Sequence, residues 1–278
     1  MTRPHIEFIH EQVLPWSQGL YGGGRPDVQV RTLSLDGDTG GSSLVLRYPP
    51  GWCRQGPEHV TSDEEFLVIS GELEINGVLY DSLAYGFLPA GHVRMSSSSK
   101  EGALVVTFLE SEPRSEAGGP AQPDAGGRLV ERVSALDGQW ESSNFHPLFP
   151  AGAGRKWLRR DPVGGEQTWI LGTMPLRSGR RSEKHPVVEE MFLLSGELVG
   201  NLGVMHAGAY FWRPPEVWHG PYGSRTGNLT LFRTKGGPLS TVFTEEGQEF
   251  DWAPDHRPVL PPSMVEVGGR PYPGKPPF

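Results

Sequence analysis

The chain contains the same sequence pattern twice. PEHVTSDEEFLVISGEL at residues 57–73 returns as SEKHPVVEEMFLLSGEL at residues 182–198, and this places Gly71 and Gly196 at an offset of 125 residues. Three further pairs keep that offset, namely Tyr85 and Tyr210, Phe87 and Trp212, and Pro89 and Pro214. Self-similarity over such a distance indicates a duplicated structural unit, and 278 residues suffice for two domains with cores of their own.

Both copies have the pattern of short β-strands. Runs rich in Val, Leu, Phe and Trp alternate with Gly, Pro, Asp and Ser, as in SSLVLRYPPG at residues 42–51, ALVVTFLE at 103–110 and NLTLFRTKGG at 228–237. No segment in these regions has the apolar periodicity of a helix. The pattern predicts an all-β protein made of two jelly-roll barrels.

Composition suggests where the domains end. SEPRSEAGGPAQPDAGG at residues 111–127 lacks large apolar side chains and is typical of a linker. We therefore predict an N-terminal domain over residues 1–115, a linker over 116–127, a C-terminal domain over 128–250, and a proline-rich tail over 251–278 that lies along the surface.

Charge and cysteine content exclude several classes of function. The formal net charge is −8 and no basic block is longer than a pair, so we expect no binding to nucleic acid or to an anionic membrane, and favour a small-molecule ligand or a protein partner. The single cysteine, Cys53, excludes an intrachain disulfide. The N-terminus MTRPHIEFIHEQ lacks the apolar region of a signal peptide, so the prediction is a soluble, cytoplasmic protein.

The repeated motifs resemble those of a known superfamily. The first copy reads His-x4-Glu-Glu-x5-Gly-Glu-Leu from His59, followed by Tyr-x-Phe-x-Pro-Ala-Gly. The second reads His-x3-Glu-Glu-x5-Gly-Glu-Leu from His185, followed by Tyr-x-Trp-x-Pro-x3-Trp-His. These are similar to the paired motifs of cupins, and the chain most resembles the ChrR-like bicupins over residues 30–110 and 155–240. The resemblance implies two tandem cupin domains and a homodimer.

By this resemblance, the second copy keeps three metal ligands, which are His185, Glu189 and His219. Glu183 has the same strand parity as His185 and serves either as a fourth oxygen ligand or as an acid beside the metal. Two histidines and a carboxylate suit a divalent ion, Fe(II) above all, with Zn, Mn or Ni as alternatives. A vestigial barrel, in which these groups pair with one another or with water, is the other interpretation.

The first copy departs from the ligand pattern. The position that matches His219 holds Arg94, a second ligand position holds Pro57, and the nearby His92 is out of register. An arginine has no lone pair to donate to a metal. Arg94 either clamps Glu64 in a metal-free structural barrel, which we favour, or binds a ligand that carries a carboxylate.

Further residues are assigned around the second site. Tyr210 and Glu183 are candidates to steer protons. Arg181 shares the parity of Glu183 and either binds an anionic group of the substrate or is an exposed edge arginine. Three residues would line an aromatic substrate pocket or pack in the core, and these are Met191, Trp212 and Trp218. Glu65 and Glu190 should point away from the ligands and form surface or interface charges.

The resemblance also implies a reaction. We expect a metal-dependent oxidoreductase, a non-haem Fe(II) dioxygenase that acts on a small oxygenated carbon substrate such as a diketone, a hydroxyketone or a phenolic compound. A Zn- or Mn-dependent isomerase or hydrolase is an alternative. A bicupin that binds or senses a small ligand without turnover is another, and consumption of O2 would separate it from the enzyme.

Overall fold

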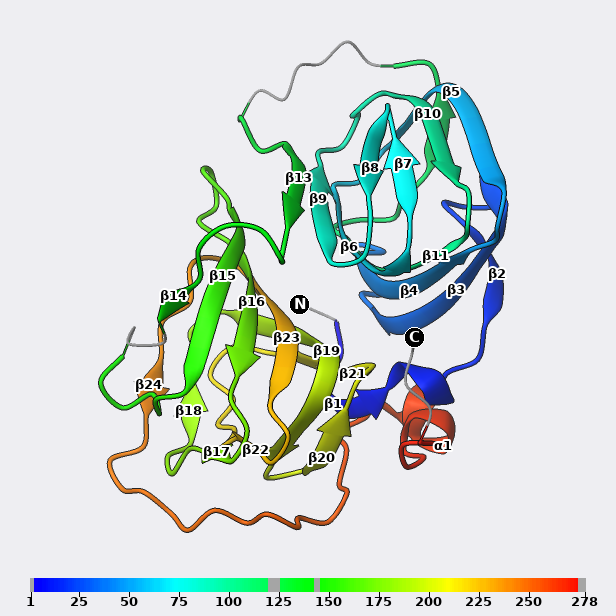
Figure 1. Cartoon of the computed structure of the whole chain (residues 1–278). Helices are drawn as coiled ribbons and strands as arrows, with labels where there is room; N and C mark the ends of the chain where they lie inside the picture. The colour runs from blue at the N-terminus through cyan, green and yellow to red at the C-terminus, as the bar shows by residue number, and fades with distance from the viewer. Residues whose placement is uncertain (1–2, 120–125, 143–145, 275–278) are drawn as a thin grey trace. The chain divides into compact units, whose positions relative to one another are not determined.

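The computed structural model describes residues 3–119, 126–142 and 146–274. These residues form two compact units, one built mainly from Pro15–Asp137 and the other from Pro4–Leu14 together with Gly138–Pro277. Strands dominate both units (Figure 1), and within the described ranges the one α-helix is α1, Val265–Gly268. None of the described helices has the length and apolarity that a membrane span requires.

The first unit consists of two antiparallel sheets. The larger sheet has the order β13 (Val130–Ser134), β9 (Ala84–Leu88), β6 (Glu64–Gly71), β11 (Ala103–Leu109), β4 (Ser42–Tyr48), β3 (Arg25–Leu35) and β2 (Ser17–Leu20). The smaller sheet has the order β12 (Ser115–Ala117), β5 (Trp52–Val60), β10 (Arg94–Ser99), β7 (Leu73–Ile75) and β8 (Val78–Tyr80). Phe66 and Val105 of the larger sheet and Ile75 of the smaller belong to one buried core. Two sheets that share a core form the predicted jelly-roll barrel.

The second unit has the same architecture. Its main sheet has the order β1 (Ile6–His10), β21 (Ala209–Arg213), β19 (Val188–Gly200), β23 (Asn228–Lys235), β16 (Gln167–Thr173), β15 (Ala153–Arg160) and β14 (Glu141–Ser142). Branching or separate strands are β17 (Arg177–Ser178), β18 (Glu183–Lys184), β20 (Gly203–His206), β22 (Gly223–Ser224) and β24 (Val242–Phe243). Short 3₁₀ turns are η1 (Glu11–Val13) and η2 (Pro262–Met264). Phe8, Met191 and Phe211 lie in its core.

The duplication is visible in the strands. β9 and β21 correspond residue for residue at the offset of 125, and β6 corresponds to the first part of β19. Gly71 and Gly196, which end these corresponding stretches, have φ of 76° and 78°. A Cβ at either glycine would lie 2.0 Å from a carbonyl oxygen, that of Gly102 or of Gly227. Only glycine fits this turn, so its recurrence confirms two copies of one barrel.

The units do not end where composition predicted. The N-terminal segment contributes β1 to the second unit, where Ile6 pairs with Trp212 and His10 with Ala209 (Figure 1). The first unit in turn extends to Asp137, because β12 and β13 join its sheets. Part of the predicted linker, residues 120–125, lies outside the described residues. Composition indicates which segments resemble loops. It does not indicate which sheet a short strand such as β1 or β12 will pair with.

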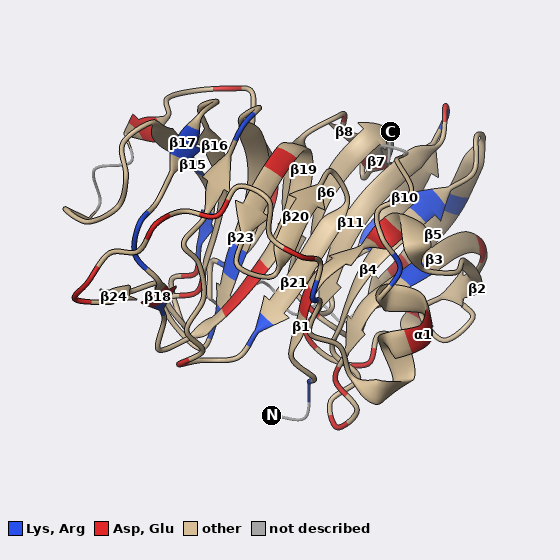
Figure 2. Cartoon of the chain, turned by 90° about the horizontal axis from the view of Figure 1, so that it is seen from below, with Lys and Arg blue, Asp and Glu red and all other residues tan. Residues whose placement is uncertain are grey.

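Charged residues of both signs are interspersed along the strands and loops of each unit (Figure 2).

The prediction of surface positions for Glu65 and Glu190 was wrong, since their exposed fractions are 1% and 0%. Tyr85 donates a hydrogen bond to Glu65, and Tyr210 donates one to Glu190. Arg233 also donates to Glu190. Strand alternation predicts only that Glu65 and Glu190 lie on the opposite face of the strand from Glu64 and Glu189. In both strands that opposite face is buried as well.

Candidate metal centre

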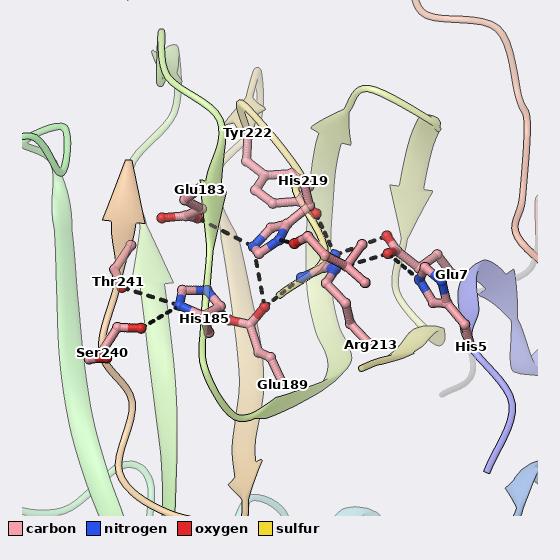
Figure 3. Close-up of polar contacts among 11 residues, drawn as sticks. His5, Glu7, Glu183, His185, Glu189, Arg213, His219, Tyr222, Ser240 and Thr241 are labelled. Carbon is pink, nitrogen blue, oxygen red and sulfur yellow. Dashed lines mark hydrogen bonds and ion pairs between the residues drawn. The ribbon is translucent and has the colours of Figure 1, made fainter. Parts of the chain in front are cut away.

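Four ionisable side chains of the second unit converge at one point (Figure 3). Glu183, His185 and His219 each offer a ligand atom, and these atoms lie within 4.8 Å of one another. Glu189 adjoins them, with Oε1 3.6 Å from His185 Nε2 and Oε2 3.6 Å from His219 Nε2. His219 Nε2 is also 3.9 Å from Glu183 Oε1. The structure therefore brings together the three predicted metal ligands and Glu183.

Main-chain pairing holds together the two chain segments that carry Glu183, His185 and His219. Glu183 and His219 exchange two backbone hydrogen bonds of 2.9 and 3.0 Å, and the N–H of Glu216 donates to the carbonyl of His185 at 2.8 Å. Glu189 stands on β19, whose neighbours in the sheet are β21 and β23. Glu189 and Glu183 thus stand on strands, and His185 and His219 lie in segments tied by main-chain hydrogen bonds, which limits the movement of all four side chains.

Both histidines present the same nitrogen to the centre. Nδ1 of His185 donates to the carbonyl of Ser240, and Nδ1 of His219 donates to the carbonyl of Val217, each at 2.9 Å. A carbonyl only accepts, so Nδ1 carries the proton and Nε2 has the free lone pair. Both Nε2 atoms are buried and have no hydrogen-bond partner among the described residues. Two buried lone pairs without a donor, aimed at two carboxylates, fit a metal ion.

The charges of the centre also fit a cation. Burial lowers the pKa of His219 well below 6.5, and the charges of Arg213 and His185 lower it further, so the imidazole is neutral. Burial raises the pKa of Glu183 from 4.5 to about 7; His185 and Arg213 oppose this shift, whereas the charge of Glu189 adds to it. A divalent cation between the two carboxylates would remove their mutual repulsion.

Arg213 links Glu189 to the N-terminal strand. Its Nη1 donates to Glu189 Oε2 at 2.5 Å, while Nε and Nη2 donate to the two oxygens of Glu7 at 2.9 Å each. Nη2 also donates to the hydroxyl of Tyr222 at 2.6 Å. Burial alone would raise the pKa of Glu7, but the charge of Arg213 and hydrogen bonds from His5 and Arg213 outweigh it, and the pKa falls from 4.5 to about 2. Glu7 is thus an ionised partner that holds Arg213 against Glu189.

The first unit uses its arginine differently. Arg94, on β10, forms an ion pair with Glu64, and the hydroxyl of Tyr21 donates to Glu64 Oε1 at 2.6 Å. Arg94 and Glu64 are 2% and 3% exposed. The structure thus shows the first of the two alternatives for Arg94, in which it clamps the carboxylate that corresponds to Glu189.

We expect Tyr21→Phe to lower the free energy of unfolding of the first unit by about 1.5–3 kcal/mol, because a hydrogen bond to a buried charged group is lost. The bound metal per chain should not change, since Glu64 lies in the other unit from His185. Urea denaturation together with elemental analysis checks both statements. A variant as stable as the parent would show that this hydroxyl contributes nothing to the carboxylate of Glu64.

Arg181 and Trp218 lie near the centre in different ways. Arg181 lines the cavity beside the metal centre, and its Nη1 donates to the main-chain carbonyls of Thr244 and Glu245. Trp218 is 47% exposed, and the amino group of Lys184 lies 5.3 Å from the centroid of its ring.

The structure does not bring the other predicted residues to the cavity wall. Met191 is buried in the core with Phe211, and the hydroxyl of Tyr210 donates to Glu190. Trp212 is buried and is not part of the lining. The inner face of β21 instead carries its odd-numbered residues, of which Phe211 lines the cavity and Arg213 binds Glu189. For Tyr210 and Trp212 the difference is one of parity, because the even-numbered residues of β21 lie on the other face of the strand from Arg213. Met191 has the same parity as Glu189 and packs in the core of the barrel instead of lining the cavity.

Sequence reasoning missed Arg213, Glu7 and Tyr222. The available signal was a carboxylate inside the apolar run Ile6–Ile9 and an arginine directly after Tyr-Phe-Trp at residues 210–212. Charged residues inside apolar strands are usually paired when they are buried.

A cavity adjoins the metal centre and is reached by Glu183, His185 and Glu189. Its volume is ≈ 90 Å³. Aromatic side chains form much of the wall, namely Phe149, Trp169, Phe211, Tyr222, Phe232 and Phe243. The arrangement combines potential metal ligands with a small, largely apolar binding space, as expected of a small-molecule site.

Comparison with known proteins places the chain in a family. The model of DUF4437, a domain of unknown function, matches residues 7–240. The chain belongs to this family. No curated protein sequence matches it.

Solved structures of similar fold support the barrel architecture of this DUF4437 protein. A candidate dioxygenase from Nostoc punctiforme is 19% identical and has a TM-score of 0.75, with 90% of this chain and 92% of that chain covered. Oxalate decarboxylase of Bacillus subtilis is 11% identical with a TM-score of 0.56, covering 85% and 78%. Salicylate 1,2-dioxygenase of Pseudoaminobacter salicylatoxidans is 12% identical with a TM-score of 0.51, covering 74% and 76%. These proteins share the cupin fold with both units of the chain.

Proposed function

We propose that the second unit holds one divalent metal ion with His185, His219, Glu183 and Glu189, and that the protein is a metal-dependent oxidoreductase of the dioxygenase type. The observation that carries the proposal is the pair of buried Nε2 lone pairs, which face two carboxylates and lack a donor among the described residues. Nitrogen and oxygen donors in this ratio suit Fe(II), with Mn, Ni and Zn as alternatives.

The metal would polarise oxygen atoms of the substrate and, as iron, activate O2. The residues of the chain have the remaining tasks. The carbonyls of Ser240 and Val217 keep both Nε2 atoms directed into the centre. Arg213 fixes one oxygen of Glu189. The aromatic wall excludes water and holds a small oxygenated carbon substrate such as a diketone, a hydroxyketone or a phenolic compound.

Elemental analysis of the purified protein, followed by reconstitution with Fe(II) and an oxygen-electrode screen of those three compound classes, tests the proposal. We expect about one metal ion per chain, because one of the two barrels has the ligand set. At least one class should stimulate O2 uptake. A protein that binds no metal after reconstitution would refute the metal centre, and a protein that binds metal without O2 uptake would favour a ligand-binding bicupin.

A further inference from the structure

Three arginines line the cavity without a carboxylate partner. Arg177, Arg180 and Arg181 all contribute to the wall that includes Glu183 and His185. In the part of the chain that the structure describes, no carboxylate lies within ion-pair distance of any of the three. This is unusual in a chain with a net charge of −8. Other arginines of the same unit are paired, as in Arg213 with Glu7 and Glu189, Arg225 with Glu197, and Arg233 with Glu190.

Arg177, on β17, is the best fixed of the three. Its Nε donates to the carbonyls of Pro150 and Ala151, and its Nη2 also donates to that of Pro150, at 2.8 Å. The guanidinium lies 4.5 Å from the centroid of Phe149. Burial lowers the pKa of Arg177 to about 10 against the opposing charge of Glu183. The guanidinium is therefore oriented by neutral groups alone, and a bound anion would stabilise it.

The charge count of the whole centre leads to the same conclusion. A divalent ion would balance Glu183 and Glu189, and Arg213 would be balanced by Glu7. A fourth arginine of the wall, Arg155, is paired with Glu141, so Arg177, Arg180 and Arg181 would then remain as the uncompensated charge. A site with surplus positive charge favours an anionic ligand over a neutral one of the same shape.

The aromatic part of the wall and the cavity volume determine which uncharged portion of a ligand would fit. Trp169 and Phe232 are stacked with ring centroids 5.5 Å apart, and Phe211 packs edge-on against Phe232. The cavity volume is ≈ 90 Å³. Because one water needs about 10–15 Å³ of such volume, there is room for roughly six to nine heavy atoms. Flat apolar groups of this size pack well against aromatic rings.

We propose that this cavity takes a small aromatic or otherwise apolar carboxylate, with the carboxylate bound by Arg177 and further attracted by Arg180 and Arg181. The apolar body packs against Trp169 and Phe232. The inference rests on the proposed function, since it names the substrate class of the same site. Among the oxygenated carbon compounds proposed above as substrates, the inference selects those that carry a carboxylate group.

Benzoate and its neutral isostere benzamide test this inference by calorimetric titration of the full chain. Both metal-free and metal-loaded protein are titrated, so that direct binding of a carboxylate to the metal is separated from binding to arginine. We expect benzoate to bind at least about tenfold more tightly than benzamide in both states, as a charge-assisted hydrogen bond requires. Arg177→Met should reduce this preference to less than about threefold, and Arg177→Lys should retain part of it.

Two further variants keep the test decisive. Arg180→Met removes a cavity charge whose side chain forms no hydrogen bond or ion pair with the described residues, and it should weaken benzoate binding without loss of folding. Arg114→Met removes an equal charge from an exposed side chain of the first unit and should change nothing. Equal binding of both probes by the parent, binding of neither, or a preference that persists in Arg177→Met would overturn the inference. Metal content is measured on the same samples, so failure of the metal centre is detected separately.

Discussion

Replacing His219 with alanine is expected to remove most of the bound metal, whereas replacing His92 is expected to leave it unchanged. His219 supplies one of two buried lone pairs, and its loss leaves His185 with carboxylates alone. The apparent affinity should fall by more than the ~10–100-fold that loss of a supporting residue causes. The two histidines follow similar proline-containing turns, PAGH and PPEVWH, which makes His92 a matched control.

Elemental analysis after reconstitution of both variants decides the outcome. A single metal per chain in the parent, about none in His219→Ala and about one in His92→Ala would place the ion in the second unit. Metal retained in His219→Ala, or lost in His92→Ala, would contradict this assignment. Thermal denaturation of both proteins shows whether a loss of metal reflects the missing ligand or a failure to fold.

Much of the fold could be predicted because the information is local and repeated. Gly71 and Gly196 mark the same turn, whose positive φ and close carbonyl contact only glycine tolerates. The alternation of strands and turns likewise occurs in both copies. A pattern that would be weak evidence in one copy therefore becomes stronger evidence for the fold. Of the candidate site, His185, Glu189 and His219 were predicted as metal ligands from the cupin resemblance, and the structure places them together with Glu183.

The parts that sequence did not predict depend on long-range pairing. Glu7 and Arg213 are 206 positions apart, and the local sequence around either residue does not indicate which residue it pairs with. β1 joins the second unit through β21, although its sequence precedes the first barrel. The parity of β21 could not be read either, because Tyr210 and Trp212 are as apolar as Phe211. Which of these faces the ligands depends on the register of the strand, and register is a tertiary property.

Glu7→Gln is expected to destabilise the second unit by about 3 kcal/mol at neutral pH, because a pKa lowered from 4.5 to about 2 corresponds to that free energy. The variant leaves Arg213 with one carboxylate in place of two. A depressed pKa contributes stability above the unfolded value, and this contribution is lost as the pH falls through the folded value. The difference between parent and variant should therefore be complete above pH 4.5 and should shrink between 4.5 and about 2.

The same variant should weaken metal binding, since Arg213 orients Glu189 and is itself oriented by Glu7. We expect a loss of about 10–100-fold in affinity, as for residues that position a metal ligand. Urea denaturation of metal-free protein, followed by hydrogen exchange of β19 and β21, gives the stability, and metal titration gives the affinity. Asp27→Asn, at an exposed position of the first unit, is the control and should stay within about 0.5 kcal/mol. If Glu7→Gln unfolds at the same urea concentration as the parent and binds metal equally well, then the N-terminal strand has no role in supporting the centre.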